Sequence, residues 1–116
     1  QIQPGDVILH DNKLSYFPSH YYAPNLPQVF LADEPGSSND TYALASQEAM
    51  QLFPQPDVTT AIATAPRIHF VVFTQAIRDY QSMGISTHPV LTELNACCSL
   101  VAPQTFGDLE IYTFDR

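Results

Sequence analysis

The feature that most constrains the fold is an almost continuous apolar run in the middle of the chain, from Arg67 to Thr74. A strand with one solvated face would carry polar residues at alternate positions, whereas this run holds a single polar side chain, His69, between its ends. The run therefore predicts a central strand in a sheet that is covered on both faces.

Shorter apolar runs bounded by turn residues predict further strands on either side of this one. The five predicted strands are residues 7–10, 28–32, 67–74, 99–102 and 109–114. The last two are joined by the turn Phe106-Gly107-Asp108 and must pair as an antiparallel hairpin.

Apolar residues at helical spacing predict helices between the strands. The predicted helices are residues 41–53, residues 75–83, which end before Gly84, and a third that begins at His88-Pro89; one helical turn fits 58–63, and 13–22 fits a short helix or an irregular loop.

Strands that alternate with helices imply parallel pairing with right-handed crossovers. The expected fold class is therefore α/β: a small three-layer α/β/α Rossmann-like sandwich with a mostly parallel sheet and a C-terminal antiparallel hairpin. With 116 residues, the chain is expected to form one domain over residues 1–116.

Composition narrows the classes of function. Hydrophobic residues make up 45% of the chain and charged residues 14%, which excludes a disordered chain. Only 4 Lys and Arg stand against 12 Asp and Glu, for a net charge of −8. Few cations are available to neutralise phosphates, so nucleic acid is not expected as a partner.

The cysteines and histidines give no metal signature. Cys97 and Cys98 are adjacent, and an ordinary disulfide needs Cα atoms further apart than neighbours lie, so we expect two small apolar side chains pointing to opposite sides. The four histidines share no close ligand spacing, and no Cys/His zinc pattern occurs, so no metal site is expected.

Motifs for cofactor binding and catalysis are also missing from the sequence. The chain has 4 glycines, and none falls in a phosphate-binding GxGxxG or GxxxxGK[ST] pattern. No GxSxG elbow of a serine hydrolase occurs. We therefore expect no cofactor and identify no catalytic residue.

A candidate ligand site follows from the sheet, since open parallel sheets bind ligands beyond the carboxyl ends of their strands. Carboxylates, a histidine, a lysine and tyrosines are expected there, a mixture that suits hydroxyl-rich neutral ligands better than anions. The residues are His10, Asp11, Lys13, Tyr16, Tyr21, Tyr22, Asp33 and Glu34. The same residues also fit structural roles, as strand-ending turns, solvated charges and a cap on the core.

Three stretches resemble a known family. They are 5–18, 67–73 and 106–112, together with His88-Pro89. They resemble the C-terminal extracytoplasmic domain of bacterial integral-membrane glycosyltransferases of the protein-mannosyltransferase and aminoarabinose-transferase group. The resemblance is a pattern of strands and turns over nearly the whole chain.

This resemblance implies a parent enzyme that transfers a sugar from a polyprenyl-phosphate donor to an acceptor outside the cytoplasm. The family's catalytic acid lies between membrane helices, and no residue here matches it. The chain, which begins at Gln1, is then expected to be part of a longer membrane protein: an extracytoplasmic, non-catalytic accessory domain that covers the active site or helps to bind the acceptor. Its expected partners are the parent's transmembrane domain and a sugar or glycan acceptor.

Two other functions fit the residues. The first is a free-standing Rossmann-like module that binds a small ligand at the strand ends. The second is a small hydrolase or transferase that uses His10, Asp11 and Asp33 in acid–base chemistry.

Overall fold

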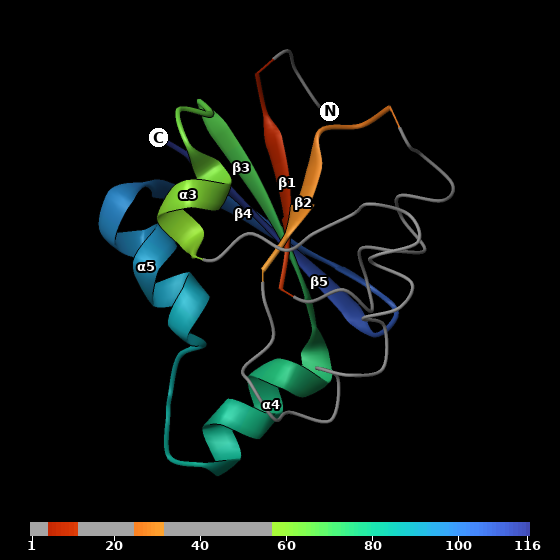
Figure 1. Ribbon diagram of the computed structural model, residues 1–116. Helices are drawn as coiled ribbons and strands as arrows, with labels where there is room; N and C mark the ends of the chain where they lie inside the picture. Colours follow the sequence, from red (N-terminus) through yellow and green to blue (C-terminus); the bar gives the residue numbers. More distant parts are fainter. Residues whose placement is uncertain (1–4, 12–24, 32–56) are drawn as a thin grey trace, which may run out of the picture.

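The computed structural model describes residues 5–11, 25–31 and 57–116, and a five-stranded sheet lies at its centre (Figure 1). The strands are β1 (Val7–His10), β2 (Gln28–Phe30), β3 (Arg67–Phe73), β4 (Ser99–Phe106) and β5 (Leu109–Asp115). Their order across the sheet is β2-β1-β3-β5-β4. The apolar run is β3, which confirms its predicted central position, and its five inner residues are buried.

The expectation of a mostly parallel Rossmann-like sandwich is wrong. β1 pairs in parallel with β2 and β3, but β5 lies antiparallel to both β3 and β4. The antiparallel ladders are also the longer ones, since each joins seven residue pairs against three and four in the parallel ladders. The predicted C-terminal hairpin is confirmed, but its second strand enters the sheet beside β3, so the fold is a small mixed α/β sheet.

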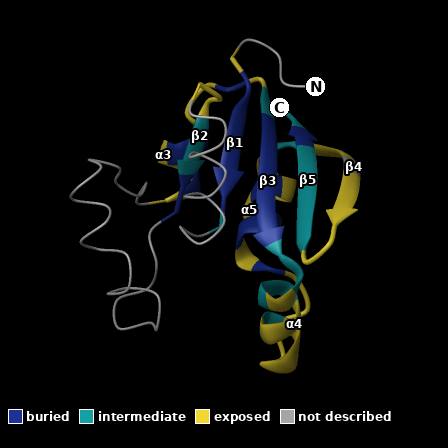
Figure 2. Ribbon diagram, turned by 90° about the vertical axis from the view of Figure 1, so that its right-hand side faces the viewer, coloured by how far each residue is buried: buried dark blue, intermediate teal, exposed yellow. Residues whose placement is uncertain are grey.

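The helices lie differently from the two outer layers of the expected sandwich. They are α3 (Val58–Ile62), α4 (Thr74–Ser82) and α5 (Pro89–Cys97). α3 and α5 cover one face of the sheet, while α4 extends beyond the end of β3 (Figures 1 and 2). The predicted helix at 41–53 and the segment 13–22 lie outside the described residues. Within the described ranges, no helix is long and apolar enough to span a bilayer.

The core lies between α3, α5 and the sheet face that they cover, here called the first face. Alternate residues of the central strands point toward this face, because side chains in a strand alternate. Helix α5 begins at Pro89, with His88 as its N-cap, which confirms the predicted start. The buried core residues include Val7, Leu9, Ile68, Phe70, Val72 and Phe114 from the sheet and Ala61, Val90, Leu91 and Leu94 from the helices.

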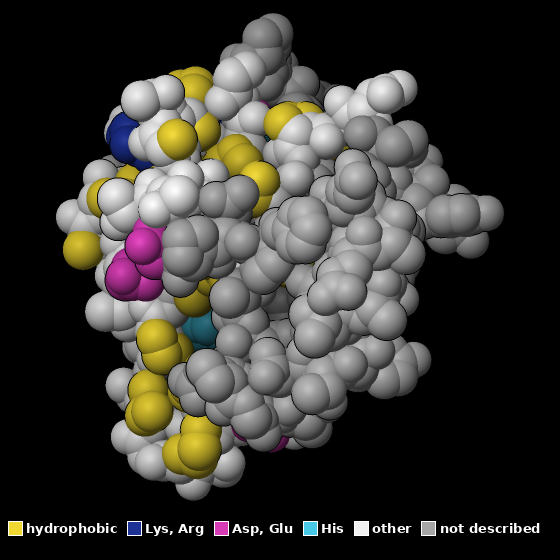
Figure 3. All heavy atoms as spheres, viewed as in Figure 1, with side chains coloured by type: hydrophobic (Ala, Val, Ile, Leu, Met, Phe, Trp, Pro, Cys, Tyr) yellow, Lys and Arg dark blue, Asp and Glu magenta, His cyan; other side chains and the backbone are white. Residues whose placement is uncertain are grey.

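Helix α4 contacts this core only at its margin, through the partly buried side chains of Ala76 and Ile77. None of its residues is fully buried, and Met83 and Ile85, which follow it, are 65% and 42% exposed. Figure 3 shows hydrophobic side chains gathered at this lower end of the molecule. The helix ends as predicted before Gly84, whose φ of +87° is a conformation that glycine adopts without strain.

The expectation for the two cysteines is wrong. Cys97 and Cys98 form a disulfide between neighbouring residues, with Cα atoms 3.8 Å apart. Helix α5 ends at Cys97, and Cys98 is already extended, with φ −147°. The backbone therefore changes conformation between the two residues, and their side chains do not alternate as they would in a continuous strand.

Candidate functional site

A pocket of about 370 Å³ lies on the second face of the sheet, opposite α3 and α5. This volume is within the range of sites for small molecules. Strands β1, β3, β4 and β5 all contribute side chains to it. The described residues that line this second-face pocket are Ile8, His69, Val71, Gln104, Phe106, Ile111 and Thr113.

A row of three polar side chains runs from Asp6, just before β1, along the second face into this pocket. His69 Nε2 lies 3.3 Å from Asp6 Oδ2, and His69 Nδ1 lies 3.2 Å from Thr113 Oγ1. The register pairs His69 directly with Thr113 across β3 and β5, so both side chains lie on the same face. Asp6 is 4% exposed, so its carboxylate is held away from bulk water beside the imidazole.

The row fixes which hydrogen-bonding groups the pocket offers. A carboxylate accepts hydrogen bonds, so Asp6 selects the tautomer of His69 with the proton on Nε2. Nδ1 then accepts, and the Thr113 hydroxyl donates to it. The lone pairs of Thr113 Oγ1 remain to receive a hydrogen bond from a ligand, and the Gln104 side chain offers both a donor and an acceptor.

The described lining of the second-face pocket also includes apolar side chains. Ile8, Val71 and Ile111 surround the polar row, and Phe106 presents a ring that is 57% exposed. A sugar ring combines hydroxyl groups with an apolar C–H face, so it fits an aromatic surface set beside hydroxyl and amide groups.

The same row has the connectivity of a nucleophile, a base and an orienting carboxylate. Catalysis of acyl transfer also needs N–H donors aimed at the developing oxyanion. Thr113 lies in β5, which is paired with β3 on one side and β4 on the other. The register of β4 against β5 shifts between Leu100 and Ala102, beside Thr113, so the ladder is irregular at this point.

At the carboxyl end of β1, His10 and Asp11 contact different partners. His10 Nε2 lies 2.8 Å from Gln28 Oε1. Burial of the ring lowers the pKa of His10 below 6.5, and the hydrogen bond to Gln28 opposes that shift only in part. His10 is 2% exposed, which makes it a buried neutral histidine that ties β1 to β2.

Asp11 faces the helix-covered side of the sheet, near the start of α5. His88 Nε2 lies 3.2 Å from Asp11 Oδ1, while His88 Nδ1 accepts the N–H of Val90 and so caps the helix. The Nε2 atom is buried and makes no aligned hydrogen bond, although it lies close to the Asp11 carboxylate. The His88 ring also meets Phe70 and Tyr80 edge to face.

The structure therefore describes two of the predicted site residues. His10 and Asp11 lie at the expected strand end, but their side chains do not converge. The remaining candidates, Lys13, Tyr16, Tyr21, Tyr22, Asp33 and Glu34, lie outside the described residues.

Sequence reasoning missed the second-face pocket. It noted His69 only as the single polar side chain of the central strand, whereas His69 contacts both Asp6 and Thr113. The available signal was the single polar residue inside an apolar strand, since a buried polar group needs partners. The position of Thr113 opposite His69 followed only from the strand order.

Metal binding and relationships to known proteins add no further assignment. In 5–11, 25–31 and 57–116, no three His, Cys, Asp or Glu side chains are grouped so that they could hold a metal ion. Searches for related proteins found no matching family model, no matching curated protein and no matching solved structure. The resemblance to membrane glycosyltransferases stays a prediction.

Proposed function

We propose that this domain is a binding module that holds a small neutral molecule with hydroxyl groups, such as a mono- or disaccharide, in the second-face pocket. The observation that carries the proposal is the Asp6–His69–Thr113 row. In this row the hydroxyl oxygen of Thr113 can accept a hydrogen bond in a pocket of about 370 Å³. The amide of Gln104 and the ring of Phe106 also line this pocket.

Charge supports a neutral ligand over an anionic one. The net charge of −8 repels anions at long range. The described residues that line the pocket include no Lys or Arg, and the carboxylate of Asp6 lies directly behind His69. Among the described lining residues, an anion would therefore meet no Lys or Arg as a counter-charge.

A sugar-binding module is compatible with the role predicted from the family resemblance. An accessory domain that helps to bind a glycan acceptor would need a site for hydroxyl groups. That this chain belongs to a membrane glycosyltransferase stays a prediction.

The test is chemical-shift mapping on the isotope-labelled domain with a panel of mono- and disaccharides. We expect shifts on the resonances of Thr113, Gln104 and Phe106. We expect no matching shifts around Leu94 and Phe114, which lie on the helix-covered face. Absence of shifts with every saccharide would contradict the proposal and leave contact with a parent membrane domain as the better account.

A matched pair of variants separates binding from folding. Thr113→Val keeps the branched shape of the side chain and removes the hydroxyl that faces the pocket, so it should abolish the shifts. Thr105→Val makes the same change one strand away, at an exposed position that does not line the pocket. Equal binding by both variants would show that Thr113 does not contact the ligand.

A further inference from the structure

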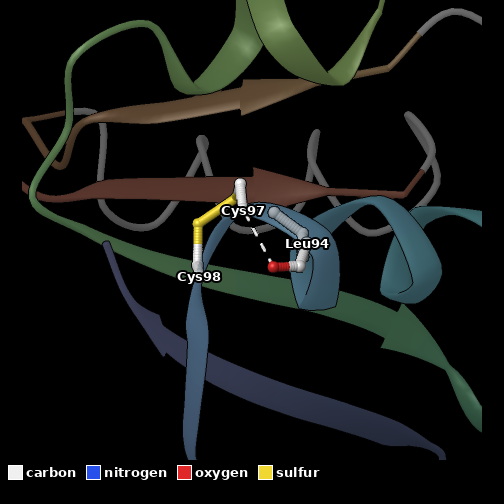
Figure 4. The surroundings of a disulfide bond; sticks show 3 residues. All are labelled: Leu94, Cys97 and Cys98. Carbon is white, nitrogen blue, oxygen red and sulfur yellow. Dashed lines mark hydrogen bonds between the residues drawn. A yellow bond between two sulfur atoms is a disulfide. The ribbon is translucent and has the colours of Figure 1, made fainter.

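The Cys97–Cys98 disulfide lies at the junction between α5 and β4 (Figure 4). Cys97 is exposed, and Cys98 is half-buried and packs against the core. Cys97 Sγ lies 3.4 Å from the carbonyl oxygen of Leu94. A disulfide sulfur carries no hydrogen, so this is a contact and not a hydrogen bond while the disulfide is intact. One sulfur of the pair is therefore open to reagents in solution.

This disulfide does not act as a structural brace. A disulfide stabilises a fold mainly by closing a loop of chain, and the effect grows with the number of residues in that loop. Neighbouring residues enclose no intervening residue. The disulfide therefore adds little stability through chain entropy. The reactivity of its two sulfur atoms is the property that could have a function.

Reduction would leave two thiols on adjacent residues and within reach of each other, the exposed Cys97 and the half-buried Cys98. Thiolates are soft ligands that select soft metal and metalloid centres. Structural zinc takes four ligands in a tetrahedron, but the described residues provide no third His, Cys, Asp or Glu beside this pair. The ligand count therefore fits a centre that is satisfied by two sulfur atoms.

We propose that Cys97 and Cys98 form a redox-gated binding site for one soft, thiophilic centre, of the chemical class of monosubstituted trivalent arsenic, which has two positions for sulfur ligands. The oxidised form has no free thiol and does not bind. A thiol or phosphine reductant opens the site by adding two electrons and two protons to the disulfide. The proposal is independent of the second-face pocket.

The probe is phenylarsine oxide, which reacts with two thiols to form two As–S bonds and release one water. The full chain is reduced with a trialkylphosphine, which is converted to its oxide, and one equivalent of the probe is added. We expect both thiols to disappear from a thiol titration, and intact mass to show one probe per chain less one water. Chain that has not been reduced should show no adduct.

Two single variants supply the control for chelation. Cys97→Ser and Cys98→Ser each keep one thiol and the local shape, so they can form only one As–S bond. A monothiol competitor should displace the probe from either variant at a concentration about 10²- to 10⁴-fold lower than from the reduced parent, as expected for losing the second of two linked contacts. Circular dichroism of the reduced chain should match that of the oxidised chain.

Several outcomes would overturn the proposal. The site is not a chelate if either serine variant holds the probe as firmly as the parent does. The gate is absent if unreduced protein, with no titratable thiol, forms the adduct equally well. Loss of the folded circular dichroism signal on reduction would make the disulfide a structural element. Retention of Zn²⁺ by the reduced parent at equal strength would show that the two sulfurs do not select soft centres.

Discussion

Replacing Phe70 by alanine tests whether the helix-covered face of β3 is the centre of the core. Phe70 is 0% exposed, and its neighbours in the sheet are Leu9 on β1 and Tyr112 on β5. Its ring also meets the His88 ring edge to face, with centroids 5.7 Å apart. The central strand cannot collapse into the space that a phenyl ring leaves, because partners on both sides hold it in register.

The expected cost is about 3–5 kcal/mol, the range for a buried Phe→Ala change that leaves a cavity. The free energy of unfolding of a natural domain is about 5–15 kcal/mol, so the variant would be close to unfolding. With a urea dependence of about 1.5 kcal/mol per molar, the midpoint should fall by roughly 2–3 M. Urea melts followed by circular dichroism measure this shift.

Phe106→Ala is the matched control, because it removes the same side chain from the exposed edge strand β4. Phe106 is 57% exposed, so the expected loss is below about 1 kcal/mol. If Phe70→Ala also costs less than about 1 kcal/mol, or if the two variants lose equal stability, the assignment of the core to this face is wrong.

The remaining predictions concern titration and surface charge. Because the pKa of His10 is lowered in the fold, the unfolded chain takes up a proton more readily than the folded chain does. The free energy of unfolding should therefore fall as pH drops below about 6.5. Urea melts at several pH values should show a smaller loss for His10→Gln. Burial raises the pKa of Tyr112 to about 12, with help from its hydrogen bond to Glu110. The contribution of Tyr112 to the free energy of unfolding should therefore be lost as pH rises above about 10. An absorbance titration of Tyr112→Phe should lack the tyrosine that ionises last. Asp115→Asn breaks the exposed ion pair with Arg67 and should cost less than about 1 kcal/mol in the same urea melts.

Most individual elements were predictable because their signals are local. The apolar run predicted β3, and the pair His88-Pro89 predicted the start of α5. The turn before β5 gave the hairpin. Each of these depends on residues close together in the chain, where side-chain periodicity and backbone preference decide the outcome.

The order of the strands in the sheet was not predictable from the alternation of strands and helices along the chain. β4 and β3 are both antiparallel to β5, so β4 runs parallel to β3, as a crossover through α4 and α5 requires. β3 and β4 are nevertheless not neighbours in the sheet, because β5 lies between them. Pro103 in β4 was a usable signal, because a proline lacks the N–H that an inner strand needs and so favours an edge position.

The position of β5 between β3 and β4 also explains why the candidate site could not be predicted from the sequence. His69 needs polar partners because it is buried in an apolar strand, but the sequence does not show which residues supply them. Thr113 meets His69 only because β5 lies between β3 and β4 in a register that pairs these two residues. Had β4 been the neighbour of β3, Thr113 would lie on an edge strand one position further away. The position of one strand therefore decides both the sheet class and the polarity of the second-face pocket, and a change that disturbs β5 should alter the two together.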